Sequence, residues 1–130
     1  MSEAVSDDLV LRDLLEPALL AKNIPFREFI EPGRKNVECF PLYTTEQTGP
    51  DGPTAMLVRY RPSATNQRHI HTGYELILVL DGELEDDHGT YGRGSMIVSP
   101  PGSSHAAFST KGCTVLIVWE KPVQRVPNEA

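Results

Sequence analysis

The 130-residue sequence predicts an all-β fold, a small sandwich or barrel, and three observations support this prediction. Apolar residues recur mostly at every second position, which is the spacing of a half-buried strand. The chain contains 11 prolines and 10 glycines, which divide it into many short elements. Seven or more short strands at regular spacing, joined by Gly, Pro and Asp turns, are typical of these architectures. At this length we expect a single domain.

The N-terminal segment, residues 1–24, differs from the rest of the chain. Residues 1–6 are small and polar, and we expect them to be disordered. Between Asp8 and Lys22 leucines recur at roughly helical spacing, but Pro17 interrupts them. This pattern predicts one or two short helical turns, whose apolar stripe would pack on the body of the protein or on a second subunit.

We expect the β-barrel to span residues 25–122. The stretches that have the composition and spacing of strands are, in chain order, 26–30, 36–43, 54–61, 74–82, 96–100, 106–110 and 113–120. Residues 45–53 are predicted to be a loop, and the strand over 74–82 is predicted to end in an Asp-Gly turn. A tight hairpin is expected within 83–95, and residues 123–130 are expected to be a polar C-terminal tail.

The charge pattern argues against some classes of partner. The formal net charge is -6, and no stretch concentrates Lys or Arg, so the chain lacks the basic surface typical of nucleic-acid or anionic-membrane binding. We interpret the acidic run Glu85-Asp86-Asp87 as surface charge that keeps a small protein soluble. No apolar run is long enough to span a bilayer, and no secretory signal is recognisable, so we expect a cytoplasmic protein.

The two cysteines do not form a metal or redox motif. Cys39 and Cys113 are far apart, and neither has a CxxC partner. This excludes a zinc-ribbon or thioredoxin pattern. We interpret both as small buried hydrophobic side chains.

Residues able to bind a metal are concentrated in "RHIHTGYELILVLDG", residues 68–82. His69 and His71 are one residue apart, so on a strand both imidazoles project to the same side. Glu75 shares their parity and can face that side if a turn redirects the chain. In a closed barrel, His105 could approach from the opposite side. Three imidazoles and one carboxylate together suit Fe(II), Zn, Ni, Mn or Cu.

Two spaced patterns in the chain resemble the two motifs of the cupin superfamily. The first is His69, any residue, His71, any three, Glu75, any six, Gly82, and the second is Gly94, any five, Pro100, any one, Gly102, any two, His105. The wider sequence resembles the ChrR-type cupins. This group includes C-terminal domains of zinc-binding anti-sigma factors and stand-alone proteins, some of them similar to dioxygenases that cleave carbon–carbon bonds in diketones or hydroxyketones.

The resemblance implies a double-stranded β-helix, the cupin or jelly-roll barrel, with a short N-terminal helical segment. It also implies that His69, His71, Glu75 and His105 are the ligands of one divalent metal ion per chain. Hydrogen-bonded barrel histidines are the alternative for the three imidazoles, but the motif spacing together with Glu75 favours metal binding.

Two positions depart from the cupin motifs. Ser63 stands where the first motif usually begins with Gly, and Ser109 stands where the second usually ends with Asn. Both positions are structural, so the metal assignment is unaffected. The serine at 63 suggests that the turn there does not need a positive φ.

We do not expect a sigma factor as a partner. Anti-sigma factors of the ChrR type carry a separate N-terminal helical domain with its own His/Cys zinc site. Residues 1–60 contain no histidine and only one cysteine, Cys39.

Three further interpretations concern surfaces. His88 belongs to a hairpin with solvent-exposed composition and is assigned to the surface. Arg59 or Arg61 could point inward and orient an anionic substrate, but surface or ion-pair roles are favoured. The apolar residues of "LILVL" (76–80) fall on both faces of their strand, so a second sheet or a second subunit must cover the outer face, and we expect a homodimer.

The same four ligands allow two functions. Zinc in a structural site is tetrahedral and closed, so these ligands would saturate it and give a non-catalytic metal- or small-ligand-binding or sensor protein. Fe(II), Mn(II) or Ni(II) prefers about six ligands, which leaves room for a bidentate diketone or hydroxyketone. Glu75 could then also act as a base. We expect a metal-dependent enzyme of the dioxygenase class on a small-molecule substrate, with Fe(II) or Zn as the leading metals.

Overall fold

The computed structural model describes residues 7–126 and confirms a mostly β barrel with two short helices. In chain order the elements are α1 (Pro17–Asn23), β1 (Arg27–Glu28), β2 (Lys35–Tyr43), α2 (Thr45–Thr48), β3 (Thr54–Thr65), β4 (His69–Ile70), β5 (Glu75–Asp86), β6 (Gly89–Gly92), β7 (Met96–Ser99), β8 (Ser104–His105), β9 (Phe108–Ser109), β10 (Cys113–Trp119) and β11 (Gln124–Arg125). None of the helices described is long and apolar enough to cross a membrane.

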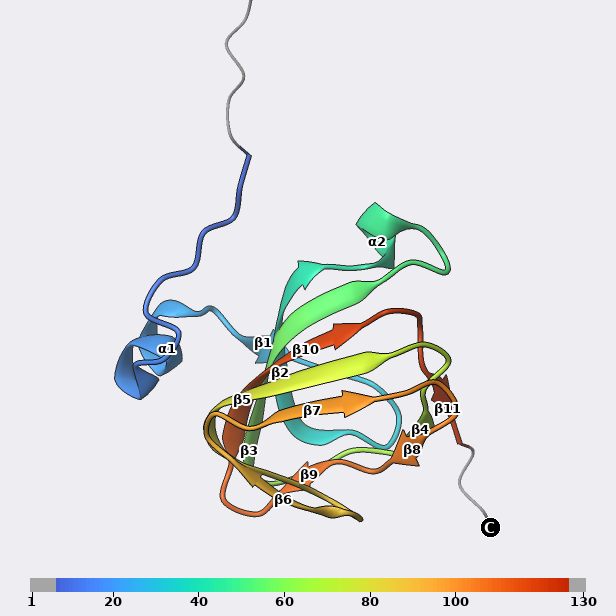
Figure 1. Ribbon diagram of the computed structural model, residues 1–130. Helices are drawn as coiled ribbons and strands as arrows, with labels where there is room; N and C mark the ends of the chain where they lie inside the picture. The colour runs from blue at the N-terminus through green and yellow to red at the C-terminus, as the bar shows by residue number, and fades with distance from the viewer. Residues whose placement is uncertain (1–6, 127–130) are drawn as a thin grey trace, which may run out of the picture.

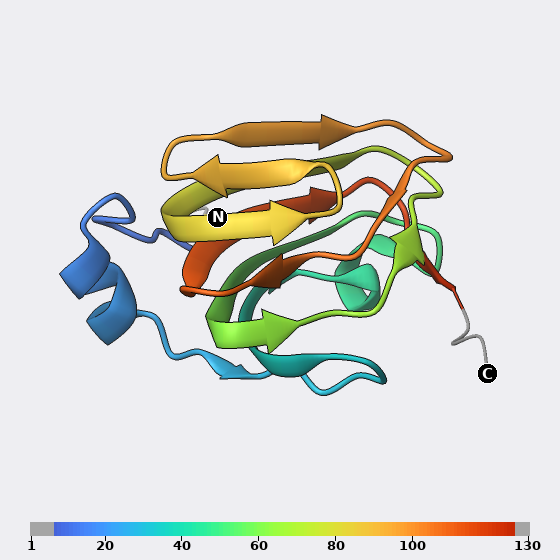
Figure 2. The same ribbon diagram turned by 90° about the horizontal axis from the view of Figure 1, so that it is seen from below.

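Eight strands form one antiparallel sheet that wraps into the barrel (Figure 1). Its order is β1-β2-β3-β10-β5-β6, with β7 paired to β5, and β9 paired to both β3 and β5. The remaining strands form a small sheet in the order β11-β4-β8. This small sheet lies at the end of the barrel opposite α1 (Figures 1 and 2). His69 of the first motif and His105 of the second are paired across β4 and β8, so they lie together at this end of the molecule.

Alternation along the strands divides the apolar side chains between two clusters. Inward-facing residues of β3, β5 and β10 fill the barrel, among them Val58, Val79 and Val115. On the outer face, Leu20 of α1 packs with Leu57 and related side chains of the same strands. The N-terminal helix thus packs on the body of the protein and covers part of the outer face of the sheet.

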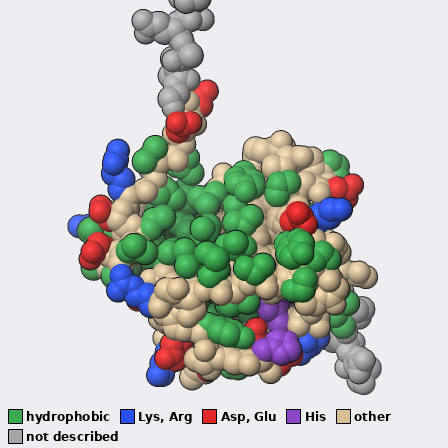
Figure 3. Space-filling model, in the orientation of Figure 1, with side chains coloured by type: hydrophobic (Ala, Val, Ile, Leu, Met, Phe, Trp, Pro, Cys, Tyr) green, Lys and Arg blue, Asp and Glu red, His purple; other side chains and the backbone are tan. Residues whose placement is uncertain are grey.

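The rest of that outer face carries an exposed apolar patch. The patch consists of the outward-facing residues of β5, β7 and β10, namely Leu76, Leu78, Met96, Val98, Leu116 and Val118. Met96 and Val98 are each 57% exposed. Hydrophobic side chains gather on the face that β5 and β7 present in the same orientation (Figure 3). No element of residues 7–126 covers this patch completely, and the homodimer stays a prediction.

Strand β5 does not end in an Asp-Gly turn, as the sequence analysis expected, but runs on to Asp86. Gly82 has a φ of 76°, and the register between β5 and β10 shifts close to this residue. The strand therefore contains a β-bulge here instead of a turn. A Cβ atom on Gly82 would lie 2.2 Å from the carbonyl oxygen of Gly112, so this position requires glycine.

The expectation for Ser63 was wrong. Its φ is 67°, which places it in the left-handed region despite its side chain. Ser63 lies within β3, and its backbone N–H donates a hydrogen bond to the carbonyl oxygen of Thr110 at 3.1 Å, so a contact from another segment holds this conformation. The geometry that glycine adopts freely is retained, and the serine carries a strain of about 1–2 kcal/mol.

Two local elements differ from their predictions. Pro17 begins α1 and does not interrupt it, because proline at the first helical position loses no needed hydrogen bond. The predicted loop over 45–53 contains α2, which starts with a capping box. Thr44 Oγ1 accepts from the backbone N–H of Glu46 at 3.2 Å, and Gln47 Oε1 accepts from the backbone N–H of Thr44 at 2.9 Å.

The interpretations of the two cysteines, of His88 and of the two arginines are confirmed. Cys39 and Cys113 are buried free thiols, and the side chain of His88 is 67% exposed. Arg59 and Arg61 both pair with a single carboxylate, that of Glu38, on the outside of the barrel. They therefore form ion pairs and do not point into the barrel interior.

Candidate metal centre

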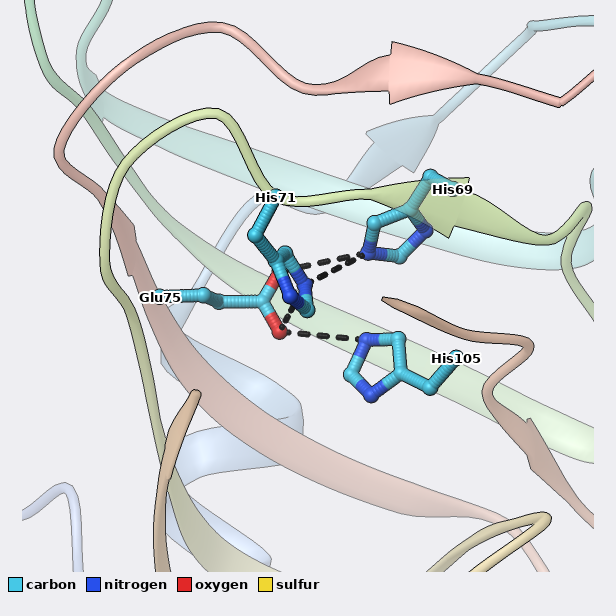
Figure 4. Close-up of side chains that lie close together, drawn as sticks. All are labelled: His69, His71, Glu75 and His105. Carbon is cyan, nitrogen blue, oxygen red and sulfur yellow. Dashed lines mark hydrogen bonds and ion pairs between the residues drawn. The ribbon is translucent and has the colours of Figure 1, made fainter. Parts of the chain in front are cut away.

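The four side chains predicted as metal ligands meet inside the barrel (Figure 4). His69 belongs to β4, His71 follows that strand directly, Glu75 opens β5, and His105 ends β8. Antiparallel pairing of β4 with β8 places His69 directly opposite His105. The sequence spacing thus brings three residues together locally, and strand pairing supplies the fourth.

One ligand atom from each of these residues lies within 4.8 Å of all the others. Nε2 of His71 and Nε2 of His105 are each 3.1 Å from Oε1 of Glu75. Nε2 of His69 is 3.4 Å from Oε2 of Glu75 and 3.1 Å from Nε2 of His71. All four residues are buried, with exposed fractions between 1% and 7%. The cluster is therefore shielded from water, so any charge in it needs an internal partner.

Ser103 determines the tautomer of His71. Its Oγ lies 2.6 Å from the carbonyl oxygen of Pro100, to which the hydroxyl donates its single proton. The same Oγ lies 2.9 Å from Nδ1 of His71 and must accept there. We therefore assign the proton of the neutral His71 ring to Nδ1, which leaves a lone pair on Nε2 facing the centre.

Trp119 holds the carboxylate of Glu75. Its indole Nε1 donates to Oε2 of Glu75 over 2.5 Å, and the two residues are direct neighbours across β10 and β5. The sequence analysis did not assign Trp119, Ser103 or Asp86 to the site. Trp119 could have been found only from the register of two strands, because 44 residues separate it from Glu75.

Electrostatics keep the Glu75 carboxylate charged. Burial raises its pKa, but the contacts with the imidazoles of His105, His69 and His71, which attract the carboxylate when they carry a second proton, outweigh burial and hold the pKa well below its usual range. Burial also lowers the pKa of His105, yet the neighbouring carboxylates of Glu75 and Asp86 outweigh it, and the net pKa is raised. The centre thus attracts positive charge, which either a proton or a metal cation can supply.

The donor set fits a divalent cation. Oε1 of Glu75 is fully buried and lies 3.1 Å from two imidazole nitrogens, yet it receives no hydrogen bond of acceptable geometry. With the proton of His71 on Nδ1, a nitrogen lone pair and a carboxylate lone pair face each other. A cation among these atoms would relieve that repulsion, and imidazole with carboxylate suits several divalent metals.

A cavity of about 280 Å³ borders Trp119, and none of the four clustered residues lines it. Its apolar wall includes Phe29, Met56 and Trp119. The guanidinium of Arg34 also borders it and stacks on the Phe29 ring, 3.7 Å from the ring centroid. The indole of Trp119 therefore touches both this cavity and the carboxylate of Glu75.

Among solved structures, this chain is similar to an acetylacetone dioxygenase from Acinetobacter johnsonii, with a TM-score of 0.74 and 14% identity over 98% of this chain and 83% of that one. It is also similar to the polyketide cyclase RemF from Streptomyces resistomycificus, with a TM-score of 0.67 and 24% identity over 83% of each chain. A third similar structure is Rhodobacter sphaeroides SigE in complex with the anti-sigma ChrR, with a TM-score of 0.57 and 24% identity over 82% of this chain and 58% of that one. At these identities the likeness shows the cupin fold alone.

No curated protein matches the chain significantly. A family model described as the ChrR cupin-like domain matches residues 20–124, which include both motifs and all four clustered residues. The chain belongs to the family of ChrR cupin-like domains.

Proposed function

We propose that the chain binds one divalent metal ion through His69, His71, Glu75 and His105 and uses it as an enzyme on a small oxygenated organic molecule. The leading class is dioxygenase chemistry on a β-diketone or an α-hydroxyketone, with Fe(II) as the metal. The observation that carries the proposal is the convergence of four buried donor atoms within 4.8 Å of one another. The similarity in fold to an acetylacetone dioxygenase supports the choice of class.

The cavity beside Trp119 supports an enzyme because it gives a compact substrate a place against the side chain that contacts Glu75. Its volume of about 280 Å³ lies just below the usual range for ligand sites, so it suits only a small molecule. Phe29, Met56 and Trp119 would pack against the carbon skeleton of such a substrate. None of the four donor residues lines this cavity, so the two oxygens of a diketone would reach the centre only if the indole of Trp119 moved aside.

A divalent metal ion in this centre would supply Lewis acidity and a template for two substrate oxygens. The chain's own residues supply the surroundings. Glu75 contributes a fixed negative charge, and the indole of Trp119 prevents its carboxylate from rotating. The low pKa of Glu75 makes it a weak proton acceptor, which supports its role as a ligand. Its role as a base stays a prediction.

Burial of the centre favours a second candidate function. Four donor atoms are sufficient for a tetrahedral zinc site, and all four residues are almost inaccessible to water. In that case the protein would be a non-catalytic zinc-binding or sensor cupin.

Metal content and oxygen uptake distinguish the two functions. The full chain is purified without a chelating tag, its metals are measured by mass spectrometry, and oxygen consumption is followed after addition of acetylacetone or a hydroxyketone. Iron near one equivalent per chain together with oxygen uptake supports the enzyme. Tightly held zinc without uptake, even after the zinc is replaced by Fe(II), supports the binding protein.

The chain offers a matched control for the site. His105→Ala should lose the metal, whereas His88→Ala should retain it, because His88 is exposed and outside the cluster. Absence of any bound metal in the wild type after incubation with Fe(II), Zn, Mn or Ni would overturn both candidate functions.

A further inference from the structure

The turn between β5 and β6 directs one carboxylate into the barrel. Asp86, the last residue of β5, has a side chain that is only 4% exposed. Its Oδ1 accepts three hydrogen bonds: from the backbone N–H of His88 at 2.8 Å, from the backbone N–H of Gly89 at 3.1 Å, and from the hydroxyl of Tyr91 at 3.0 Å. These three donors fix the orientation of the carboxylate, so Oδ2 is left to face elsewhere.

Oδ2 of Asp86 faces His105. It lies 3.4 Å from Nδ1 of that ring, a contact somewhat longer than a typical hydrogen bond. A carboxylate oxygen can only accept, so this contact favours the neutral tautomer that carries its proton on Nδ1 and a lone pair on Nε2. That Nε2 lies 3.1 Å from Oε1 of Glu75. Asp86 thus faces the outer nitrogen of His105 as Ser103 faces that of His71, over a longer distance.

The next residue, Asp87, turns the other way and provides a comparison. Its Oδ2 pairs with Arg68 at 3.0 Å, and its Oδ1 accepts from the backbone N–H of Ala106 at 3.4 Å. Arg68 directly precedes His69, and Ala106 directly follows His105. Asp87 therefore attaches the turn to both histidine-bearing strands without contacting a clustered imidazole, and the ring it meets is that of the exposed His88, at 3.8 Å.

We infer that Asp86 is a positioning residue of the metal centre, which orients the His105 ring and holds it in the tautomer whose Nε2 can bind a cation. The inference rests on the proposed metal site. A carboxylate that faces the outer nitrogen of a ligating histidine can orient the ring and increase its basicity. The acidic run Glu85-Asp86-Asp87 is therefore not only surface charge, since its middle residue is buried and faces a ligand.

Replacement of Asp86 by Asn tests the inference because it puts a hydrogen-bond donor where an acceptor now faces Nδ1 of His105. The three donors that face Oδ1 would select the amide oxygen, so the amide NH2 would face Nδ1 of His105. The ring would then carry its proton on Nε2, aimed at the cation. We expect Asp86→Asn to weaken zinc binding about 10–100-fold in competition with a chromophoric chelator. Asp87→Asn, the matched control, should bind zinc as tightly as the wild type.

The ring tautomer gives a second readout that needs neither metal nor activity. Nitrogen-15 NMR of the metal-free full chain, at an alkaline pH where imidazole is neutral, distinguishes Nδ1–H from Nε2–H. We expect the Nδ1–H form of His105 in the wild type and in Asp87→Asn, and the Nε2–H form in Asp86→Asn. A merely structural role of Asp86 would not exchange the tautomers.

The outcomes separate this inference from the proposed function. If the wild type binds zinc and Asp86→Asn binds it equally well, the role of Asp86 is disproved while the metal site stands. If the wild type binds no metal, the proposed function fails, and the tautomer of His105 still decides what Asp86 does. If Asp86→Asn does not fold, the wild-type spectrum remains decisive, because a His105 protonated on Nε2 would overturn the inference.

Discussion

The indole nitrogen of Trp119 lies 2.5 Å from Oε2 of Glu75, so the chain's single tryptophan is in direct contact with the candidate metal centre. Trp119 also borders the neighbouring cavity. Tryptophan fluorescence of the protein therefore reports on this position alone, and both metal binding and ligand binding should change it.

Titration with metal ions should change this fluorescence. An open-shell ion such as Fe(II), Ni(II) or Cu(II) close to the indole should quench the emission. Closed-shell zinc should change the emission intensity without strong quenching. The end point is expected near one equivalent per chain. His88→Ala should give the same titration, and His105→Ala should give none. An equal response in His105→Ala would show that the metal binds elsewhere.

Loss of the Ser103 hydroxyl should weaken metal binding. In Ser103→Ala, Nδ1 of His71 loses its acceptor, so the ring is free to rotate and to change its tautomer. The expected loss in zinc affinity is about 10-fold or more, measured by chelator competition. Ser104→Ala, at the next residue, is the control, because its hydroxyl contacts Arg68 and no imidazole. Equal losses in the two variants would contradict the role assigned to Ser103.

Replacement of Ser63 by glycine should stabilise the protein. Relief of the left-handed strain is worth about 1–2 kcal/mol, and the added freedom of the unfolded chain removes about 0.4–1 kcal/mol of this gain. The net increase in the free energy of unfolding should be about 0.5–1 kcal/mol, measured by urea denaturation. Ser99→Gly, within strand β7, should instead destabilise the protein. A loss of stability in Ser63→Gly would show that the serine side chain makes a compensating contact.

Stability in acid should depend on Glu38. Hydrogen bonds from Arg59, with a further one from Arg61, outweigh burial and lower the pKa of the Glu38 carboxyl below 4.5. Because the folded-state pKa is depressed, this carboxylate stabilises the protein above its unfolded-state pKa, and the contribution disappears as the pH falls through the folded-state value. Glu38→Gln should therefore be less stable than the wild type near neutral pH, by at most about 1 kcal/mol.

Thermal unfolding at a series of pH values measures this effect. The difference between wild type and Glu38→Gln should narrow as the pH falls below 4.5, since protonation then removes the same charge from the wild type. The other carboxylates are common to both proteins and cancel in the comparison. A difference that stays constant down to strongly acidic pH would contradict the assignment.

The exposed apolar patch on β5, β7 and β10 tests the predicted homodimer. If a second copy covers it, Val98→Glu should place a charge in the interface and convert dimers to monomers in size-exclusion chromatography with light scattering. Ile30→Glu, at a residue that is 82% exposed and outside the patch, should leave the assembly unchanged. A wild-type protein that remains monomeric at high concentration would refute the predicted homodimer.

Much of the site could be predicted because its residues are close in sequence. His69, His71 and Glu75 share a parity along one stretch of chain, and local backbone geometry makes residues of one parity face the same side. The all-β fold was predictable for the same reason, since period-two spacing is a local property. His105 required the resemblance to a known motif, because its partner strand lies 36 residues away in the small sheet.

The partners of these residues could not be predicted in this way. Trp119, Ser103 and Asp86 meet the centre through strand register and through the bulge that extends β5 beyond Gly82. The positive φ of Ser63 also depends on a contact made elsewhere, with the carbonyl oxygen of Thr110. The sequence by itself therefore determined which side chains can bind a metal. The tertiary structure alone decided which groups orient them, because long-range pairing, and not local spacing, brings those groups within hydrogen-bonding distance.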